Sequence, residues 1–196
     1  MKRLSELISI DGHVCPWWLA YTFDNPVRRI LHRPEIVLAG LVRQGQTVLD
    51  IGCGMGHFTI GMAKMVGPHG RVIAVDIQDR MLDHVRRRAM KDGLSERIVL
   101  HKGEVSGVEM SGEVDFALAF WMVHEVPDQS AFFQAVKGLL KPDGLFLMAE
   151  PKMHTSKTDL EKSLLIASRA WLTTVSEPHI SFSRCALLTP SNNRIA

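Results

Sequence analysis

The sequence has little of what disulfide-rich or metal-clipped domains require. Its 196 residues include only three cysteines, and these are scattered along the chain with no CxxC pair (Cys15, Cys53 and Cys185). A disulfide framework or a zinc knuckle is therefore not expected. No two histidines stand at HxxxH spacing, so we expect no metal site. Such sparse cysteine usage is typical of a reducing compartment, which predicts a cytoplasmic protein.

A strong excess of one charge and long apolar runs are also lacking. The formal net charge is +2, too small a bias to indicate nucleic acid as a partner. The longest apolar stretches, such as FALAFWMV, are far shorter than the roughly 20 residues that a membrane span needs. The start, MKRLSELISIDGH, lacks the apolar segment of a secretory signal. The composition, 46% hydrophobic and 22% charged, is that of a globular protein, and the length predicts one domain over 1–196.

Strand-like and helix-like segments alternate between residues 46 and 150, the predicted core. The predicted strands are 46–52, 71–76, 97–103, 114–120 and 145–150, and the predicted helices are 57–66, 79–91 and 128–140. The strands are continuously apolar, which is typical of parallel strands covered on both faces. The pattern predicts an α/β fold with a doubly wound, Rossmann-like sheet. We further expect Asp79 to cap the second helix and KPDG (141–144) to form a turn.

The two ends of the chain differ from this core. Residues 1–45 predict a helical cap over the sheet, with short helices beginning at Asn25–Pro26 and at Pro34. Residues 151–196 predict a last helix over 159–171, followed by a hairpin of strands near 172–177 and 182–188. The cap carries an aromatic group that is either core packing or a wall for a hydrophobic substrate: Trp17, Trp18, Tyr21 and Phe23.

The strongest motif is VLDIGCGMGHF, residues 48–58, at the end of the first strand and the start of a helix. In such sheets ligands bind at the carboxyl ends of the strands. Gly52, Gly54 and Gly56 lack Cβ atoms, so the backbone there can turn tightly and approach a ligand. The N–H groups at the helix start can bind an anionic group. The bland alternative is a tight structural turn.

Two acids accompany the glycines. The GxGxG spacing differs from the GxGxxG of dinucleotide sites, and Asp50 precedes it by two residues. An acid there suits a ligand with an ammonium group. Asp76 ends the second strand, where a carboxylate can accept both hydroxyls of a ribose; the alternative role is a surface helix cap. A nucleoside with a cationic, amino-bearing arm describes S-adenosylmethionine better than NAD.

Residues 46 to about 150 resemble class I S-adenosylmethionine-dependent methyltransferases, most of all the small-molecule branch around the ubiquinone and menaquinone biosynthesis enzymes. Four segments in order carry the resemblance: VLDIGCGMG, RVIAVDIQDRML, VDFALAFWMVHEVPD and LKPDGLFLMAEP. It implies a seven-stranded sheet of order 3-2-1-4-5-7-6, mostly parallel, with strand seven antiparallel. Ala170-Trp171 stands where the family often has Gly-Phe after the last helix.

The resemblance also implies residue roles. The methionine arm of the cofactor would lie along Gly52, Cys53, Gly54, Met55 and Gly56, supported by Asp50; Asp76 would take the ribose and Ile77 the adenine face. Gly103, Glu104 and Val105 stand where the family commonly has an acid for the adenine amino group, with Glu here in place of Asp; Glu104 could equally be a solvated loop acid. Phe120 and Trp121 stand near the amino group of the cofactor and the substrate edge. Cys53 is expected to be an ordinary small residue there.

The implied activity is methyl transfer by in-line displacement to a small, apolar or aromatic acceptor. The protein would supply proximity, alignment and desolvation. A base is needed only for a protonated acceptor, and no catalytic residue is assigned; the candidates, each of which could equally be an ordinary loop residue, are His124, Glu125, Glu150 and His154. Trp17, Trp18, Tyr21 and Trp121 are candidates for the substrate pocket. Two alternatives stay open: a non-catalytic S-adenosylmethionine-binding module and an NAD(P)-dependent oxidoreductase. The oligomeric state is not predicted.

Overall fold

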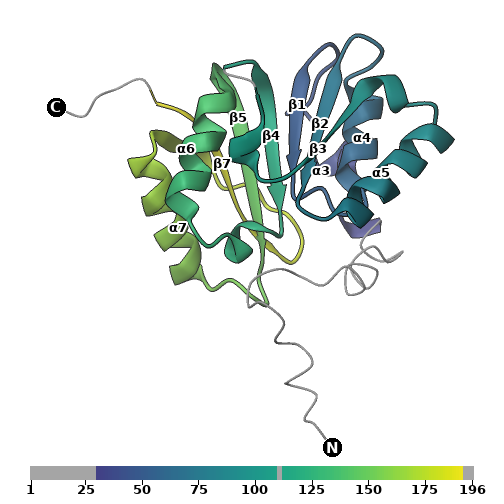
Figure 1. Ribbon diagram of the computed structural model, residues 1–196. Helices are drawn as coiled ribbons and strands as arrows, with labels where there is room; N and C mark the ends of the chain where they lie inside the picture. Colours follow the sequence, from purple (N-terminus) through teal and green to yellow (C-terminus); the bar gives the residue numbers. More distant parts are fainter. Residues whose placement is uncertain (1–29, 110–111, 192–196) are drawn as a thin grey trace, which may run out of the picture.

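The computed structural model describes residues 30–109 and 112–191, and these form a seven-stranded sheet of order β3-β2-β1-β4-β5-β7-β6 (Figure 1). The strands are β1 (Thr47–Ile51), β2 (Arg71–Asp76), β3 (Ile98–Lys102), β4 (Val114–Phe120), β5 (Leu140–Pro151), β6 (Leu172–Ser176) and β7 (Ser183–Pro190). Neighbouring strands from β3 to β5 pair in parallel, whereas β7 is antiparallel to both β5 and β6. The predicted fold class, strand order and antiparallel strand seven are confirmed.

Helices cover both faces of the sheet (Figure 1). The α-helices are α3 (Pro34–Val37), α4 (His57–Met65), α5 (Asp79–Lys91), α6 (Gln129–Leu139) and α7 (Lys157–Arg169), and the short 3-10 turns are η2 (Ser95–Arg97), η3 (Val105–Gly107) and η4 (Val123–Glu125). Alternate strand residues enter different clusters: Leu49 packs with Phe133 of α6, whereas Val48 packs with Met62 of α4. Burial on both faces explains the continuously apolar strands.

The start of α5 differs from the expectation. Its N-cap is Gln78, not Asp79, and the Gln78 side chain makes no capping hydrogen bond. Asp79 is the first helical residue, and its exposed carboxylate pairs with Lys102 Nζ at 2.6 Å. The Gln78 N–H instead donates a hydrogen bond of 2.9 Å to Oδ1 of Asp76. The Asp76 carboxylate thus binds the backbone N–H of the N-cap residue itself, while no N-cap side chain accepts from the first turn of α5.

The KPDG segment is not a separate turn but lies within β5, where Val114 pairs with Leu140 before the register shifts towards Phe116. Backbone packing holds the segment against β4, because a Cβ on Gly144 would lie 2.9 Å from the Val114 carbonyl oxygen. Lys141 Nζ also reaches Asp115 Oδ1 at 2.5 Å. The segment nevertheless bends as a turn within the strand: the residues from Leu140 to Leu145 oppose only those from Val114 to Phe116, and a Cβ on Gly144 would also lie 3.0 Å from the Lys141 carbonyl oxygen.

The last helix is also shifted from its predicted bounds, since α7 runs from Lys157 to Arg169 rather than over 159–171. Its N-terminus is a capping box in which Ser156 and Asp159 bond to each other's backbone N–H groups. Past its end, Ala170 keeps a negative φ of −88°, and Trp171 adopts the left-handed φ of 63°. A tryptophan therefore takes the conformation that glycine usually provides there.

The predicted cap lies mostly outside the described residues, including Trp17, Trp18, Tyr21, Phe23 and the helix start at Asn25–Pro26. The predicted helix at Pro34 is present as α3, with the proline in its first turn. Across residues 30–109 and 112–191, no helix combines the length and apolar character needed to cross a membrane.

Candidate functional site

The glycine loop joins β1 to α4 and turns through three left-handed residues. Gly52, Gly54 and Gly56 have φ values of 66°, 52° and 81°, a region that costs a residue with a Cβ atom energy. The N–H groups of Gly52 and Cys53 both donate to the Val75 carbonyl, at 2.9 and 3.0 Å. These bonds fasten the loop to β2, so its conformation is fixed by the sheet.

The three glycines differ in what surrounds them. A Cβ on Gly52 would lie 2.9 Å from Met122 Cγ, and one on Gly56 would lie 2.9 Å from Val85 Cγ2. A Cβ on Gly54 would meet nothing within 4 Å. The outer glycines are thus required by packing, whereas Gly54 presents bare backbone to open space. The loop can therefore admit a ligand at Gly54.

Asp76 lies directly against this loop. Its carboxylate is buried, and it accepts hydrogen bonds from the N–H of Gly54 at 3.0 Å and of Gln78 at 2.9 Å. Burial raises the pKa of Asp76 above its ordinary value, although these backbone donors oppose the shift. A buried carboxylate held by donors on one side can still accept hydroxyl groups on the other.

Asp50 is the second buried acid, 3% exposed at the end of β1. Its Oδ2 accepts a hydrogen bond of 2.5 Å from the Thr59 hydroxyl, on the first turn of α4. Thr59 itself is fully buried. The sequence analysis did not identify Thr59, although a polar residue on the inner face of an otherwise apolar helix was a signal for it.

Arg88 is another residue that sequence reasoning missed. Its Nη1 donates to the carbonyl of Met55 at 2.8 Å, which links α5 to the glycine loop. Within the loop, Cys53 is buried, and burial together with the nearby Asp50 and Asp76 raises its pKa well above the ordinary value. Both effects disfavour the thiolate, the reactive form of a cysteine.

The residues after β3 lie next to Asp76. The Gly103 N–H donates to the Asp76 carbonyl at 3.0 Å, so both strand ends meet at one edge. Glu104 is exposed and Val105 is buried. Ile77, just past Asp76, is 46% exposed, so its apolar side chain is accessible to a ligand. An apolar ring laid against Ile77 would cover it.

The end of β4 carries an aromatic cluster. Phe120 packs on Phe58 with a ring separation of 4.5 Å, and His32 lies 5.1 Å from both Phe120 and Trp121. Trp121 has a left-handed φ of 63°, and its indole N–H donates to Ser183 Oγ at 2.9 Å. Strained residues of this kind concentrate at functional sites. His32 was not predicted to belong here.

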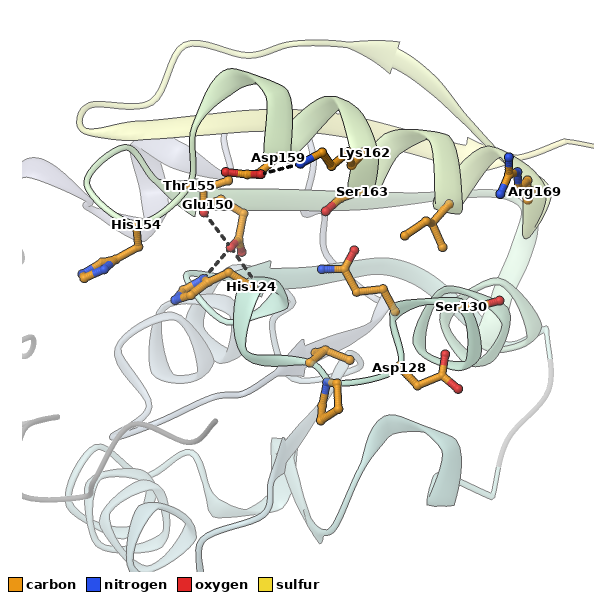
Figure 2. Close-up of a pocket in the computed structure, with 14 residues that line it drawn as sticks. His124, Asp128, Ser130, Glu150, His154, Thr155, Asp159, Lys162, Ser163 and Arg169 are labelled. Carbon is orange, nitrogen blue, oxygen red and sulfur yellow. Dashed lines mark hydrogen bonds and ion pairs between the residues drawn. The ribbon is translucent and has the colours of Figure 1, made fainter. Parts of the chain in front are cut away.

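Glu150, near the end of β5, and His124, in η4 after β4, point toward each other (Figure 2). Glu150 is 2% exposed, and its Oε2 lies 2.5 Å from His124 Nδ1. Burial opposes protonation of His124, but the hydrogen bond and charge of Glu150, with the charge of Glu125, outweigh it and raise the His124 pKa. The exposed ring of His154 stacks parallel to that of His124, 5.9 Å between centroids.

An open groove of about 850 Å³ runs from these two histidines along the space between α6 and α7 (Figure 2). Ser163, Ile166 and Arg169 of α7 line its far part. The groove does not include the glycine loop, so the polar cluster has its own opening to solvent. In the described part of the chain, no three His, Cys, Asp or Glu side chains gather as a metal-ion site would require.

Residues 43–180, well over half of the chain, match the family described as Methyltransferase domain. The chain belongs to this family. The resemblance noted in the sequence is thereby confirmed, and the matched range includes the glycine loop, both buried acids and the Glu150–His124 cluster.

Relatives of this methyltransferase domain include a demethylmenaquinone methyltransferase of Lactobacillus johnsonii, 31% identical over 59% of this chain and 48% of the relative. A ubiquinone biosynthesis O-methyltransferase of Xanthomonas axonopodis pv. citri is 32% identical over 73% of this chain and 59% of the relative. The chain thus spans about half the length of these curated relatives. A crystal structure of a SAM-dependent methyltransferase from Aquifex aeolicus superposes with a TM-score of 0.77 at 25% identity, covering 90% of this chain and 98% of that one.

Proposed function

We propose that this methyltransferase domain binds S-adenosylmethionine at the glycine loop and transfers its methyl group to a small molecule. The observation that carries the proposal is the pairing of Gly54 with Asp76. Gly54 offers bare backbone to open space, and the buried Asp76 carboxylate stands against it. Membership of the methyltransferase domain family supports the same activity.

The residues present fit this cofactor. Asp76 has acceptor capacity for ribose hydroxyls, and the exposed Ile77 offers an apolar surface for an adenine ring. Glu104, exposed beside Gly103, is proposed to face the adenine amino group. The buried Asp50 places negative charge under the loop, which suits the ammonium and sulfonium groups. When bound, the cofactor supplies an activated methyl group that is transferred by in-line displacement.

The chain itself then has to bind the cofactor and the acceptor, orient them for transfer and exclude water from the site. The fastening of the loop to Val75 keeps the cofactor site rigid, which lowers the entropy that binding must remove. Phe120 and Trp121, at the end of β4, are proposed to form the wall between cofactor and acceptor. Their cluster with Phe58 and His32 is apolar on most sides, so water is kept from the reacting atoms.

The acceptor is proposed to be small and apolar or aromatic. Trp121, the partly exposed member of the aromatic cluster at the end of β4, supports this, because flat apolar molecules bind well against such a ring. Two relatives are named as a demethylmenaquinone methyltransferase and a ubiquinone biosynthesis O-methyltransferase, and both names refer to quinone biosynthesis. Trp17, Trp18 and Tyr21, which lie outside the described residues, stay predictions for the acceptor site.

The test begins with isothermal titration of the protein with S-adenosylhomocysteine, and with NAD and NADP in parallel. Binding of S-adenosylhomocysteine alone is expected. Binding of NAD or NADP alone would assign the site to an oxidoreductase instead. Transfer is then followed with S-adenosylmethionine labelled in its methyl group and a panel of small phenols and quinols. Tight binding without transfer to any acceptor would favour the non-catalytic binding module.

A further inference from the structure

Glu150 is surrounded by hydrogen-bond donors. Its Oε1 accepts from the Val123 N–H at 3.0 Å, and its Oε2 accepts from the His124 N–H at 3.0 Å and from the Thr155 hydroxyl at 3.4 Å. The His124 ring nitrogen Nδ1 adds a contact of 2.5 Å to Oε2. Backbone N–H groups can only donate, so both carboxylate oxygens of Glu150 act as acceptors. Three of the four partners belong to Val123 and His124 of η4, and the fourth is Thr155 in the segment between β5 and α7, so Glu150 holds the loop after β4 in place.

The acceptor oxygens of Glu150 decide which nitrogen of His124 carries the proton. Because Glu150 Oε2 can only accept, Nδ1 must donate, and in the neutral ring Nε2 then has a free electron pair. The carboxylate also stabilises the protonated ring, because the positive charge forms 2.5 Å from it. This arrangement makes Nε2 of His124 a stronger base than Nε2 of a histidine in water.

The surroundings of Nε2 leave it open to a proton donor. The His124 side chain is 26% exposed, and the nearest charged group to Nε2 is Glu125, at 3.9 Å. The parallel His154 ring lies 5.9 Å away, and Asp128, Asp159 and Lys162 line the adjoining groove. The base therefore lies at the carboxyl ends of β4 and β5, two residues beyond Met122, whose side chain contacts the glycine loop.

We propose that His124 is the general base of this site, that Glu150 positions it, and that the methyl acceptor presents a weakly acidic hydroxyl group to His124 Nε2. The proposal deepens the proposed function and rests on it. An acceptor of this kind is a poor nucleophile until it loses its proton, and a base of near-neutral pKa is suited to remove it.

The proton transfer balances as follows. The O–H bond of the acceptor breaks, its electron pair stays on the oxygen, and the proton forms an N–H bond at Nε2. A neutral imidazole and a hydroxyl become an imidazolium and an oxyanion, and Glu150 stabilises the imidazolium through Nδ1. The imidazolium returns to its neutral form by releasing the proton to water at the exposed edge of the ring.

The central variant is His124→Asn. The amide nitrogen of asparagine occupies a position like that of Nδ1, so it can keep the bond to Glu150 while the base is lost. The matched control is His69→Asn, in the exposed turn between α4 and β2, at the opposite ends of the strands. Both variants and the wild type are titrated with S-adenosylhomocysteine, which should bind all three equally.

Transfer is compared for two acceptors, phenol and 4-nitrophenol, at a pH where only the second is ionised. With phenol, the His124→Asn rate should fall by about 100- to 10,000-fold, and with 4-nitrophenol it should stay near the wild-type rate. His69→Asn should match the wild type with both. A loss that is equal for both phenols would overturn the base assignment, and so would a wild type that binds S-adenosylhomocysteine but methylates neither.

A second readout does not depend on turnover. Nitrogen-15 spectra of the imidazole groups should show neutral His124 protonated at Nδ1, and Glu150→Gln should lower the His124 pKa. Neutral His124 protonated at Nε2 would overturn the proposal. Failure of S-adenosylhomocysteine to bind the wild type would overturn the proposed function and with it the methyl acceptor at His124. The tautomer and pKa of His124 are measured on the free protein, so they test its pairing with Glu150 separately.

Discussion

Oδ2 of Asp76 accepts a hydrogen bond of 3.0 Å from the backbone N–H of Gly54, across 22 residues of sequence. The bond joins the end of β2 to the middle of the glycine loop. It also explains why a buried carboxylate is kept here, although burial raises its pKa and so disfavours its charge. A ligand that donates hydroxyl groups to Asp76 would offset that cost, which makes the acid and the glycine parts of one binding site.

Replacement of Asp76 by asparagine should weaken cofactor binding while the fold remains. The change removes the charge that ribose hydroxyls would bond to, and hydrogen bonds to charged groups contribute about 1.5–3 kcal/mol each. We expect the affinity for S-adenosylhomocysteine to fall roughly 10- to 100-fold, measured by isothermal titration. Asp83→Asn, an exposed acid on α5, is the control and should bind normally. Unchanged affinity in Asp76→Asn would exclude the ribose role.

Gly54→Ala should separate binding from stability. The new Cβ meets no atom within 4 Å, so the free protein loses only the cost of a left-handed alanine, about 1 kcal/mol. Gly93→Ala is the matched control, because Gly93 is also left-handed, at 67°, with nothing within 4 Å of its Cβ position. Both variants should lose similar stability to urea. Only Gly54→Ala should lose affinity for S-adenosylhomocysteine, and equal affinities would place the ligand elsewhere.

Much of the fold follows from local patterns in the sequence. The buried strands read as apolar runs, and the helices are marked by apolar stripes such as that of Met81, Leu82 and Val85, so their order could be predicted. The acids Asp50 and Asp76 could be identified in the same way, because Asp76 ends β2 and Asp50 lies one residue before the end of β1, at the carboxyl ends of the strands.

What could not be predicted depends on contacts between distant residues. The 2.5 Å contact of His124 with Glu150 requires β4 and β5 to be neighbours, and nothing local shows that the two side chains meet. The left-handed tryptophans are a second case. Trp121 and Trp171 adopt φ values of 63° that sequence propensity assigns to glycine, because the surrounding structure determines the backbone there.

Arg88 should act on cofactor binding without contacting the cofactor. Its bond to the Met55 carbonyl steadies the loop from α5, so Arg88→Ala should loosen the loop. We expect a loss of affinity for S-adenosylhomocysteine of a few-fold to about tenfold, the effect of one charge-assisted hydrogen bond. Arg87→Ala removes the same charge from the exposed neighbouring position and is the matched control. If both variants lose affinity alike, the effect comes from net charge and not from the loop.

The His124–Glu150 pair should make the stability of the protein depend on pH. The folded state raises the pKa of His124 above its ordinary value, so the folded protein binds this proton more tightly than the unfolded chain does. The resulting stabilisation is fully present below the unfolded pKa, near 6.5, and is lost as the pH rises through the folded pKa. Urea unfolding of the wild type and of His124→Asn should therefore differ more at about pH 6 than at about pH 8.5.

The source of this pH dependence can be isolated with a double-mutant cycle. In a Glu150→Gln background the charge that raises the His124 pKa is absent, so the difference between His124 and its asparagine variant should change little with pH. Glu150→Gln will itself lower stability, because an amide group would face the N–H groups of Val123 and His124. That loss enters both arms of the cycle and cancels. A pH-dependent difference of the same size in both backgrounds would show that Glu150 does not tune His124.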